Sequence, residues 1–138
     1  MSFKKPLIAV MFSLSLAGCQ LTPPADNKFL FVQPQPSPHL EGIWTGTMGP
    51  YMMSLMFDAN GTGYDCYAWN GKNVISRIKY DGKNIHYQEG GYQRLDSITS
   101  TSLIVSFPNL PPPSYTLVKD NELKQADPFC VVELPKLK

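Results

Sequence analysis

The chain has 138 residues, of which 43% are hydrophobic, and 12 basic and 11 acidic side chains give it a formal net charge of +1 at pH 7. This near-neutral charge offers no electrostatic basis for binding nucleic acid. The length suffices for one small domain with a single hydrophobic core.

The N-terminus has the anatomy of a secretory signal peptide. Lys4 and Lys5 precede an apolar run at residues 7–16, which is shorter than the roughly 20 residues that a membrane-spanning helix needs. The run ends at Leu16-Ala17-Gly18-Cys19, which resembles the lipobox of bacterial lipoproteins. That resemblance implies removal of residues 1–18 and attachment of a diacylglycerol, usually with a third acyl chain, to Cys19.

Lipidation at Cys19 would make the membrane a partner of the mature chain. Two or three acyl chains anchor a protein stably without any membrane-spanning helix. Gln20 follows the cysteine. In enteric-type envelopes an aspartate there tends to retain lipoproteins in the inner membrane, so Gln20 favours the outer membrane by analogy and leaves the face of that membrane open.

Residues 19–38 are predicted to form a lipidated, proline-rich tether ahead of a domain at residues 39–138. Proline fixes the backbone in extended conformations and removes amide donors, so the segment is expected to be semi-rigid. Its apolar stretch Phe29-Leu30-Phe31-Val32 either docks on the domain as a first strand or rests at the lipid headgroups. Docking is favoured because strand pairing also satisfies the backbone polar groups.

Two cysteines remain after Cys19. Export places Cys66 and Cys130 in an oxidising compartment, where an even pair in a small domain is typical of a disulfide. The expected disulfide joins the middle of the domain to its end.

The body of the chain has the pattern of short β-strands. From residue 41 onward apolar residues recur at a spacing of two, with turn residues between the runs and Asn-Gly pairs suited to tight hairpins. The predicted strands cover 41–48, 51–58, 63–69, 73–80, 84–89, 92–98, 102–107, 114–119, 122–125 and 129–134. These ten short segments predict an all-β fold class, in which eight or nine short strands form a small up-and-down antiparallel barrel.

The first strand also carries a family resemblance. Gly42-Ile43-Trp44 resembles the Gly-x-Trp motif that opens lipocalin and avidin-type barrels, which implies that Trp44 closes one end of the barrel. The chain departs from a true lipocalin in lacking a long connecting loop, a terminal helix and an arginine that would pack over Trp44. A looser resemblance is to the lysozyme-inhibitor lipoproteins, which are short disulfide-tied barrels on a lipid anchor.

The aromatic residues of the third strand are candidates for binding. Tyr67 and Trp69 alternate with Cys66 and Ala68, so the two pairs point to opposite faces. If Cys66 and Ala68 face inward, Tyr67 and Trp69 form an exposed contact patch. The alternative is that these rings cover the small core.

A second candidate contact is the proline-rich connection at residues 108–113, which presents Leu110 at its tip. Such a loop is preorganised, so it loses little entropy on docking. It either contacts a partner or caps the barrel.

No catalytic residue, metal site or cofactor is predicted. His39 and His86 are isolated in the sequence, and the carboxylates are scattered singly. The predicted function is a non-enzymatic outer-membrane lipoprotein that binds an envelope protein partner, of inhibitor, immunity or assembly-accessory type. The alternative is a lipocalin-like carrier or sensor of a small apolar ligand, indicated by Trp44 and by the methionine-rich second strand.

Overall fold

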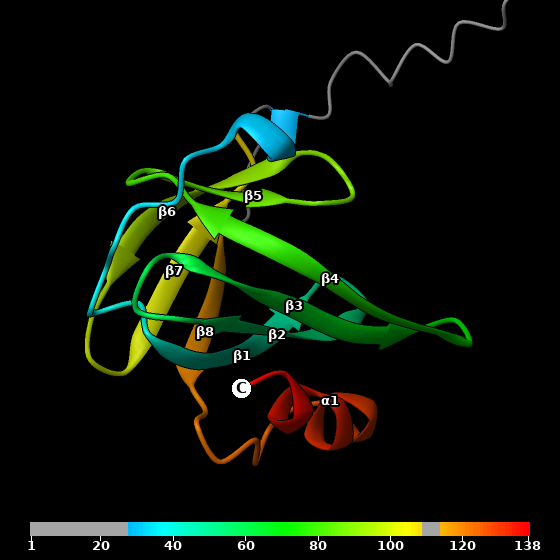
Figure 1. Ribbon diagram of the computed structural model, residues 1–138. Coiled ribbons are helices and arrows are strands. Elements are labelled where there is room, and N and C mark those ends of the chain that lie inside the picture. Colours follow the sequence, from blue (N-terminus) through cyan, green and yellow to red (C-terminus); the bar gives the residue numbers. More distant parts are fainter. Residues whose placement is uncertain (1–27, 109–113) are drawn as a thin grey trace, which may run out of the picture.

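The computed structural model describes residues 28–108 and 114–138. The strands follow one another as a closed antiparallel barrel in which β8 pairs back with β1 (Figure 1). They are β1 (Gly42–Met48), β2 (Tyr51–Phe57), β3 (Thr62–Trp69), β4 (Lys72–Tyr80), β5 (Asn84–Tyr87), β6 (Tyr92–Ile98), β7 (Ser102–Ser106) and β8 (Tyr115–Lys119). The predicted up-and-down barrel is confirmed.

Strand β2 shows how the sequence pattern builds the wall. Its alternate residues Tyr51, Met53, Leu55 and Phe57 belong to the cluster that fills the barrel. Met56, on the other face of the strand, belongs to a second cluster outside the wall. Successive side chains on a strand point to opposite faces. Strand β2 is apolar on both faces because the interior cluster covers one face and the second cluster covers the other.

The barrel interior is filled by side chains. The buried members of the interior cluster are Leu40, Trp44, Met48, Met53, Leu55, Phe57, Ile78, Ile85, Leu103, Val105 and Leu117. They come from strands all around the barrel and from the segment before β1. The barrel is therefore a packed core with its strands as the wall, and little of its interior is open.

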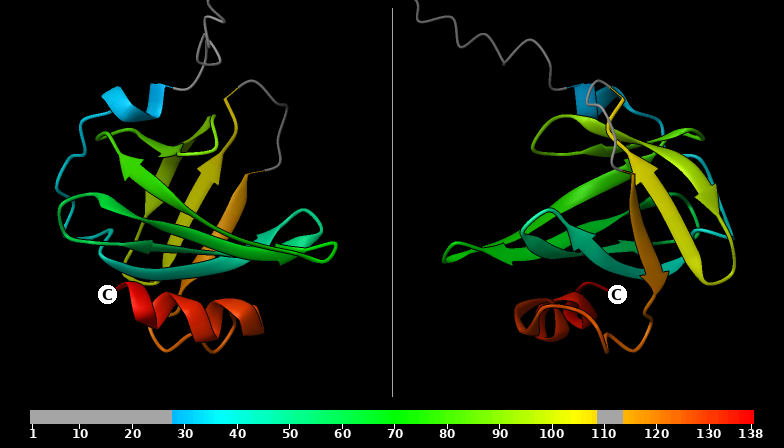
Figure 2. Two further views of the ribbon diagram at one scale, coloured as in Figure 1. Left: turned by 45° about the vertical axis from the view of Figure 1, so that its right-hand side comes forward. Right: turned by 180° about the vertical axis from the view of Figure 1, so that it is seen from behind.

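The β3–β4 hairpin projects beyond the rest of the barrel (Figures 1 and 2). The two strands pair along their whole length around the Asn70-Gly71 turn, where both residues have positive φ. Strand β5 pairs with β4 only at Ile78, Lys79 and Tyr80. Within the described residues, the first half of β4 is therefore paired on one side only.

The C-terminal segment corrects the prediction. Residues 122–125 form turns, and residues 128–137 form α1 (Pro128–Glu133) and η2 (Leu134–Leu137), so the predicted last two strands and the expected lack of a terminal helix are wrong. Asp127 caps α1, since its carboxylate accepts a hydrogen bond from the Phe129 N–H at 2.8 Å, and Pro128 fits the first helical position.

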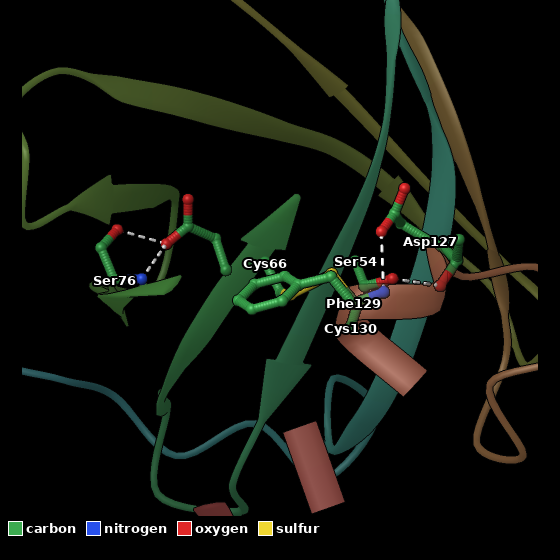
Figure 3. Close-up of a disulfide and its surroundings, with 8 residues drawn as sticks. Ser54, Cys66, Ser76, Asp127, Phe129 and Cys130 are labelled. Atoms are coloured by element: carbon green, nitrogen blue, oxygen red, sulfur yellow. Dashed lines mark hydrogen bonds between the residues drawn. A yellow bond between two sulfur atoms is a disulfide. The ribbon is translucent and has the colours of Figure 1, made fainter. Parts of the chain in front are cut away.

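Helix α1 covers the outer face of the barrel (Figures 1 and 2). A disulfide joins Cys66 on β3 to Cys130 on α1, with Phe129 beside it (Figure 3). Ile43, Met56, Leu123 and Leu134 complete the apolar cluster around the disulfide. Cys66 therefore faces outward under the helix. The outward placement of Tyr67 and the inward placement of Ala68 assumed that Cys66 faces inward, and this assumption is wrong.

The segment before β1 packs on the barrel as a 3-10 helix, η1 (Lys28–Phe31), where a strand was predicted. Phe29 is buried beneath the Lys79 ammonium group, which lies 4.6 Å from its ring centroid and donates a hydrogen bond to the Phe29 carbonyl at 3.0 Å. Leu30 and Phe31 remain 79% and 82% exposed. Docking is thus present, with a different backbone from that predicted.

The chain from η1 to β1 runs along the barrel. The Gln35 N–H donates to the Tyr80 carbonyl at 2.7 Å, and the Ser37 N–H donates to the Ala59 carbonyl at 3.2 Å. The described part of the predicted tether, residues 28–38, therefore contacts the domain. Helices η1 and α1 lie on opposite sides of the barrel (Figure 2). No helix within residues 28–108 and 114–138 has the length and apolar character to span a membrane.

Candidate functional site

One end of the barrel is closed by Trp44. Its indole N–H donates to the Leu40 carbonyl at 2.8 Å, and the Lys119 ammonium group lies 4.3 Å from its ring centroid. Both Trp44 and Leu40 are fully buried. The expectation that Trp44 closes the barrel fits this geometry, while its candidate role in binding does not, because no ligand reaches a fully buried ring. The sequence offers no arginine to pack over Trp44, and Lys119 packs over its ring instead.

The opposite end holds a cavity of about 150 Å³. It lies where β1 gives way to β2 and where β5 ends, so the inward residues at those strand ends line it. The stacked rings of Tyr51 and Tyr67, with centroids 4.7 Å apart, form one wall. The other lining residues are Met48, Met53, Asp65, Tyr87, Glu89, Gly90, Gln93 and Phe107. We call this feature the mouth cavity.

Asp65 is the most unusual residue of the mouth cavity. It lines the cavity from β3 with 2% of its surface exposed, and its Oδ1 accepts hydrogen bonds from the backbone N–H and the hydroxyl of Ser76. Burial raises the pKa of Asp65 to about 6, the Ser76 hydroxyl opposes that change, and the Glu89 carboxylate adds to it. The carboxyl is therefore ionised only above about pH 6.

A second buried polar group, on β6, lines the same cavity. Gln93 is 1% exposed, its Oε1 accepts a hydrogen bond from the Tyr87 hydroxyl, and its Nε2 donates to the Met48 sulfur at 3.5 Å. Burial raises the pKa of Tyr87 well above its usual range, so the phenol is a neutral donor. Buried polar groups of this kind need such partners, because an unpaired one costs about 1–3 kcal/mol.

Of the sequence-predicted binding residues, the structure places Trp44 and Tyr67 at the interior core and leaves Trp69 exposed. Tyr67 lies inside, stacked on Tyr51. Trp69 has the same orientation along β3 but is 47% exposed, because it lies at the end of the projecting hairpin. Tyr67 therefore follows the alternative that these rings cover the core, and only Trp69 of the pair is exposed. Cys19 and Leu110 lie outside the described residues.

Asp65, Tyr87 and Gln93 were missed by sequence reasoning. The available signal was the alternation across the β2–β3 hairpin, because inward Phe57 pairs with Gly63. Counting by twos from Gly63 gives Asp65 and Tyr67 as inward residues. The choice of Cys66 as the inward residue concealed this.

The mouth cavity has the chemistry of a binding site. Its side chains supply two carboxylates, phenols, an amide and thioethers, and no histidine or cysteine is among the described residues that line it. Phenols and thioethers accommodate carbon groups, and carboxylates attract positive charge. The arrangement therefore suits recognition of a small group.

The closed eight-stranded barrel, sealed by Trp44 at one end and open to a small cavity at the other, defines a lipocalin-like protein. The chain belongs to the family described as bacterial lipocalin LPS transport optimiser YedD, whose model matches residues 26–134. The motif Gly42-Ile43-Trp44 had indicated a lipocalin-like barrel without specifying a family.

Two solved structures from Streptococcus pneumoniae are similar in fold. One is a crystal structure described as a lipoprotein, with 15% identity, a TM-score of 0.51 and coverage of 63% of this chain and 100% of that one. The other is a lipocalin lipoprotein affecting virulence, with 12% identity, a TM-score of 0.51 and coverage of 62% and 96%. No curated protein sequence matches the chain significantly. At these identities the two structures support the fold alone.

Proposed function

We propose that this chain is a lipid-anchored envelope protein that supports lipopolysaccharide (LPS) transport by contacting a protein partner, as a non-enzymatic accessory. The description of its family as an LPS transport optimiser supports the process. The packed barrel interior is the observation that supports contact over carriage of a lipid.

The mouth cavity is small for a carrier. Ligand pockets usually enclose about 300–1,000 Å³, whereas this cavity has about 150 Å³. Below it the fully buried Leu55, Leu103 and Leu117 fill the barrel. A lipid chain would have to displace these side chains, and each displaced Leu would lose packing of about 2–5 kcal/mol. Carriage of a small apolar ligand is therefore the less supported alternative.

The projecting β3–β4 hairpin is the proposed contact surface. Trp69 is 47% exposed at its end, and tryptophan is enriched among residues that dominate binding energy at interfaces. The first half of β4 also has one side that no described strand pairs with, which suits addition of a partner strand. Leu110 remains a second proposed contact.

The proposed anchor restricts where the barrel can act. With Cys19 acylated after removal of residues 1–18, the chain from Cys19 to Lys28 reaches at most about 30 Å from the membrane. Leu30 and Phe31 on η1 are exposed close to that attachment. The barrel would therefore work beside the outer membrane, where LPS is inserted.

Deletion and complementation in the source bacterium test this function. Loss of the protein is expected to slow the arrival of pulse-labelled LPS at the cell surface and to raise sensitivity to a large hydrophilic antibiotic. The wild-type gene should restore both, and Cys19→Ala behind an ordinary signal peptide should fail because the barrel is no longer held at the membrane. Unchanged LPS arrival in the deletion strain, with LPS transport made limiting, would contradict the proposal.

A further inference from the structure

We propose that the mouth cavity binds a primary alkylammonium group, with its carbon chain against the rings of Tyr51 and Tyr67 and its charge at the carboxylates of Asp65 and Glu89. The inference concerns a ligand class and does not depend on the proposed role in LPS transport. Three observations support it: the size of the cavity, the tyrosine rings that line it, and two carboxylates with no positively charged side chain among the described lining residues.

The size of the cavity selects small groups. A cavity of about 150 Å³ in a protein interior holds one molecule the size of benzene, and the mouth cavity has this volume. A four-carbon alkylammonium ion is of that size, and so is the end of a lysine side chain. The thioethers of Met48 and Met53 line the same space, and they adapt readily to a flexible carbon chain.

The rings favour a cation. Ammonium groups are attracted to the faces of aromatic rings within about 6 Å. Tyr51 and Tyr67 stack with their planes 25° apart, and Tyr87 is a third tyrosine in the lining. The same chain already places ammonium groups over rings twice, since Lys119 covers Trp44 at 4.3 Å and Lys79 covers Phe29 at 4.6 Å.

The carboxylates provide the charge. Asp65 is 2% exposed and Glu89 lies beside it in the lining, while no lysine, arginine or histidine is among the described lining residues. A buried anion without a cationic partner is costly. Both hydrogen bonds from Ser76 reach Oδ1 of Asp65, so a cation that approaches Oδ2 does not compete with them.

The alternatives fit less well. An anion would be repelled by the two carboxylates, and a neutral apolar molecule would leave them without a counter-charge. A metal ion would find two carboxylates, and no group of three metal-ligating side chains exists in the described parts of the chain. An alkylammonium ion uses both the rings and the charge.

Titration calorimetry of the lipidated protein in a non-ionic detergent at pH 7.5 tests the proposal. The probes are n-butylammonium chloride and its neutral counterpart 1-butanol. Saturable one-to-one binding of n-butylammonium is expected, with 1-butanol weaker by about tenfold or more because it lacks the charge. Ligand methylene protons should also shift upfield in the NMR spectrum, since they would lie over tyrosine rings.

Variants locate the site. Asp65→Asn, which retains groups able to bond Ser76, should weaken n-butylammonium binding by about tenfold or more, and Glu89→Gln, at an exposed position, should weaken it less. The matched control is Asp58→Asn, which removes the same charge from an exposed position outside the mouth cavity and should leave binding unchanged. Thermal unfolding shows whether each variant is folded. If Asp65→Asn does not fold, Glu89→Gln still tests whether a carboxylate of the mouth cavity binds n-butylammonium.

A third probe, Nα-acetyl-lysinamide, distinguishes the source of the group. Binding comparable to that of n-butylammonium assigns the site to a lysine side chain of a protein, and binding of n-butylammonium alone assigns it to a free small amine; both outcomes support the proposal. It is overturned if neither amine binds saturably up to about 10 mM, if 1-butanol binds equally well, or if the carboxylate variants bind as the wild type does.

Discussion

Asp65 is a carboxylate held inside an apolar barrel, and this position links the stability of the fold to pH. Burial raises its pKa to about 6, so the folded protein holds the proton more tightly than the unfolded chain does. The stabilisation is therefore full below pH 3.8, the ordinary value, and is lost as the pH rises through about 6.

Comparison with Asp65→Asn isolates this effect, because the amide does not ionise. Between pH 4 and pH 7.5 the free energy of unfolding of the wild type should fall relative to that of Asp65→Asn, by on the order of 2 kcal/mol. Urea unfolding of both proteins at the two pH values measures the difference, and other ionisable groups cancel in it. The same offset between the proteins at both pH values would contradict the assignment.

Lys119 gives a second prediction for a single residue. Its ammonium group lies over Trp44 and bonds to the Glu41 carbonyl. Lys119→Met keeps a long side chain but removes the charge, so it should lower the free energy of unfolding by about 1 kcal/mol. Lys119→Arg is the control and should retain most of the stability in chemical denaturation. Equal stability of Lys119→Met and the wild type would show that the cation adds nothing at this ring.

Trp44 and Cys66 show which side-chain positions could and could not be predicted from the sequence. The motif at Gly42 and Trp44 predicts a tryptophan that closes the barrel, and the ring is fully buried there. The inward face of β3 could not be decided from the sequence, which left open whether Cys66 or Tyr67 faces the interior. Here the outer face has its own core beneath α1, so polarity alone does not distinguish the two faces.

At the scale of elements, α1 depends on contacts distant in sequence. It has six residues, fewer than the roughly 12–15 that an isolated helix needs for stability in water. Its buried residue Cys130 and the following Leu134 are four positions apart and both contact the outer cluster, which is helical spacing. Two apolar positions are too few for the sequence to distinguish a helix from a short strand, so the pattern alone predicted a strand.

The disulfide holds this element on the barrel. Cys66 and Cys130 are separated by 64 positions, and a loop of that length raises the entropy cost of unfolding by up to about 4 kcal/mol. The double variant Cys66→Ser, Cys130→Ser should lose about 2–4 kcal/mol in urea unfolding while the barrel circular dichroism is retained. A double variant as stable as the wild type would contradict a stabilising role.

The N-cap of α1 gives a smaller effect in the same assay. Asp127→Ala removes the acceptor for the Phe129 N–H and should cost about 1 kcal/mol. Asp127→Asn retains an acceptor and is the matched control, expected within a few tenths of a kcal/mol of the wild type. Equal losses in the two variants would show that the charge, rather than the cap, matters at this position.

At the scale of the whole molecule, the closed barrel was predictable because its strands are joined by turns with clear signals, such as Asn70-Gly71. The mouth cavity was not predictable, since it depends on which inward residues meet across strands far apart in sequence. Asp65 and Gln93 come from β3 and β6. Only closure of the barrel brings them to the same end.

The central claim is that the barrel acts through its surface while its interior stays packed. Photo-crosslinking in living cells tests it most directly, with benzoylphenylalanine at Trp69 on the projecting hairpin or at Tyr67 two residues earlier inside the barrel. Both positions already hold aromatic rings, so the substitutions are matched. If the barrel acts through its surface, position 69 forms an adduct with a protein of the LPS-transport machinery and position 67 forms no LPS adduct. An LPS adduct at position 67 with no protein adduct at position 69 would contradict it.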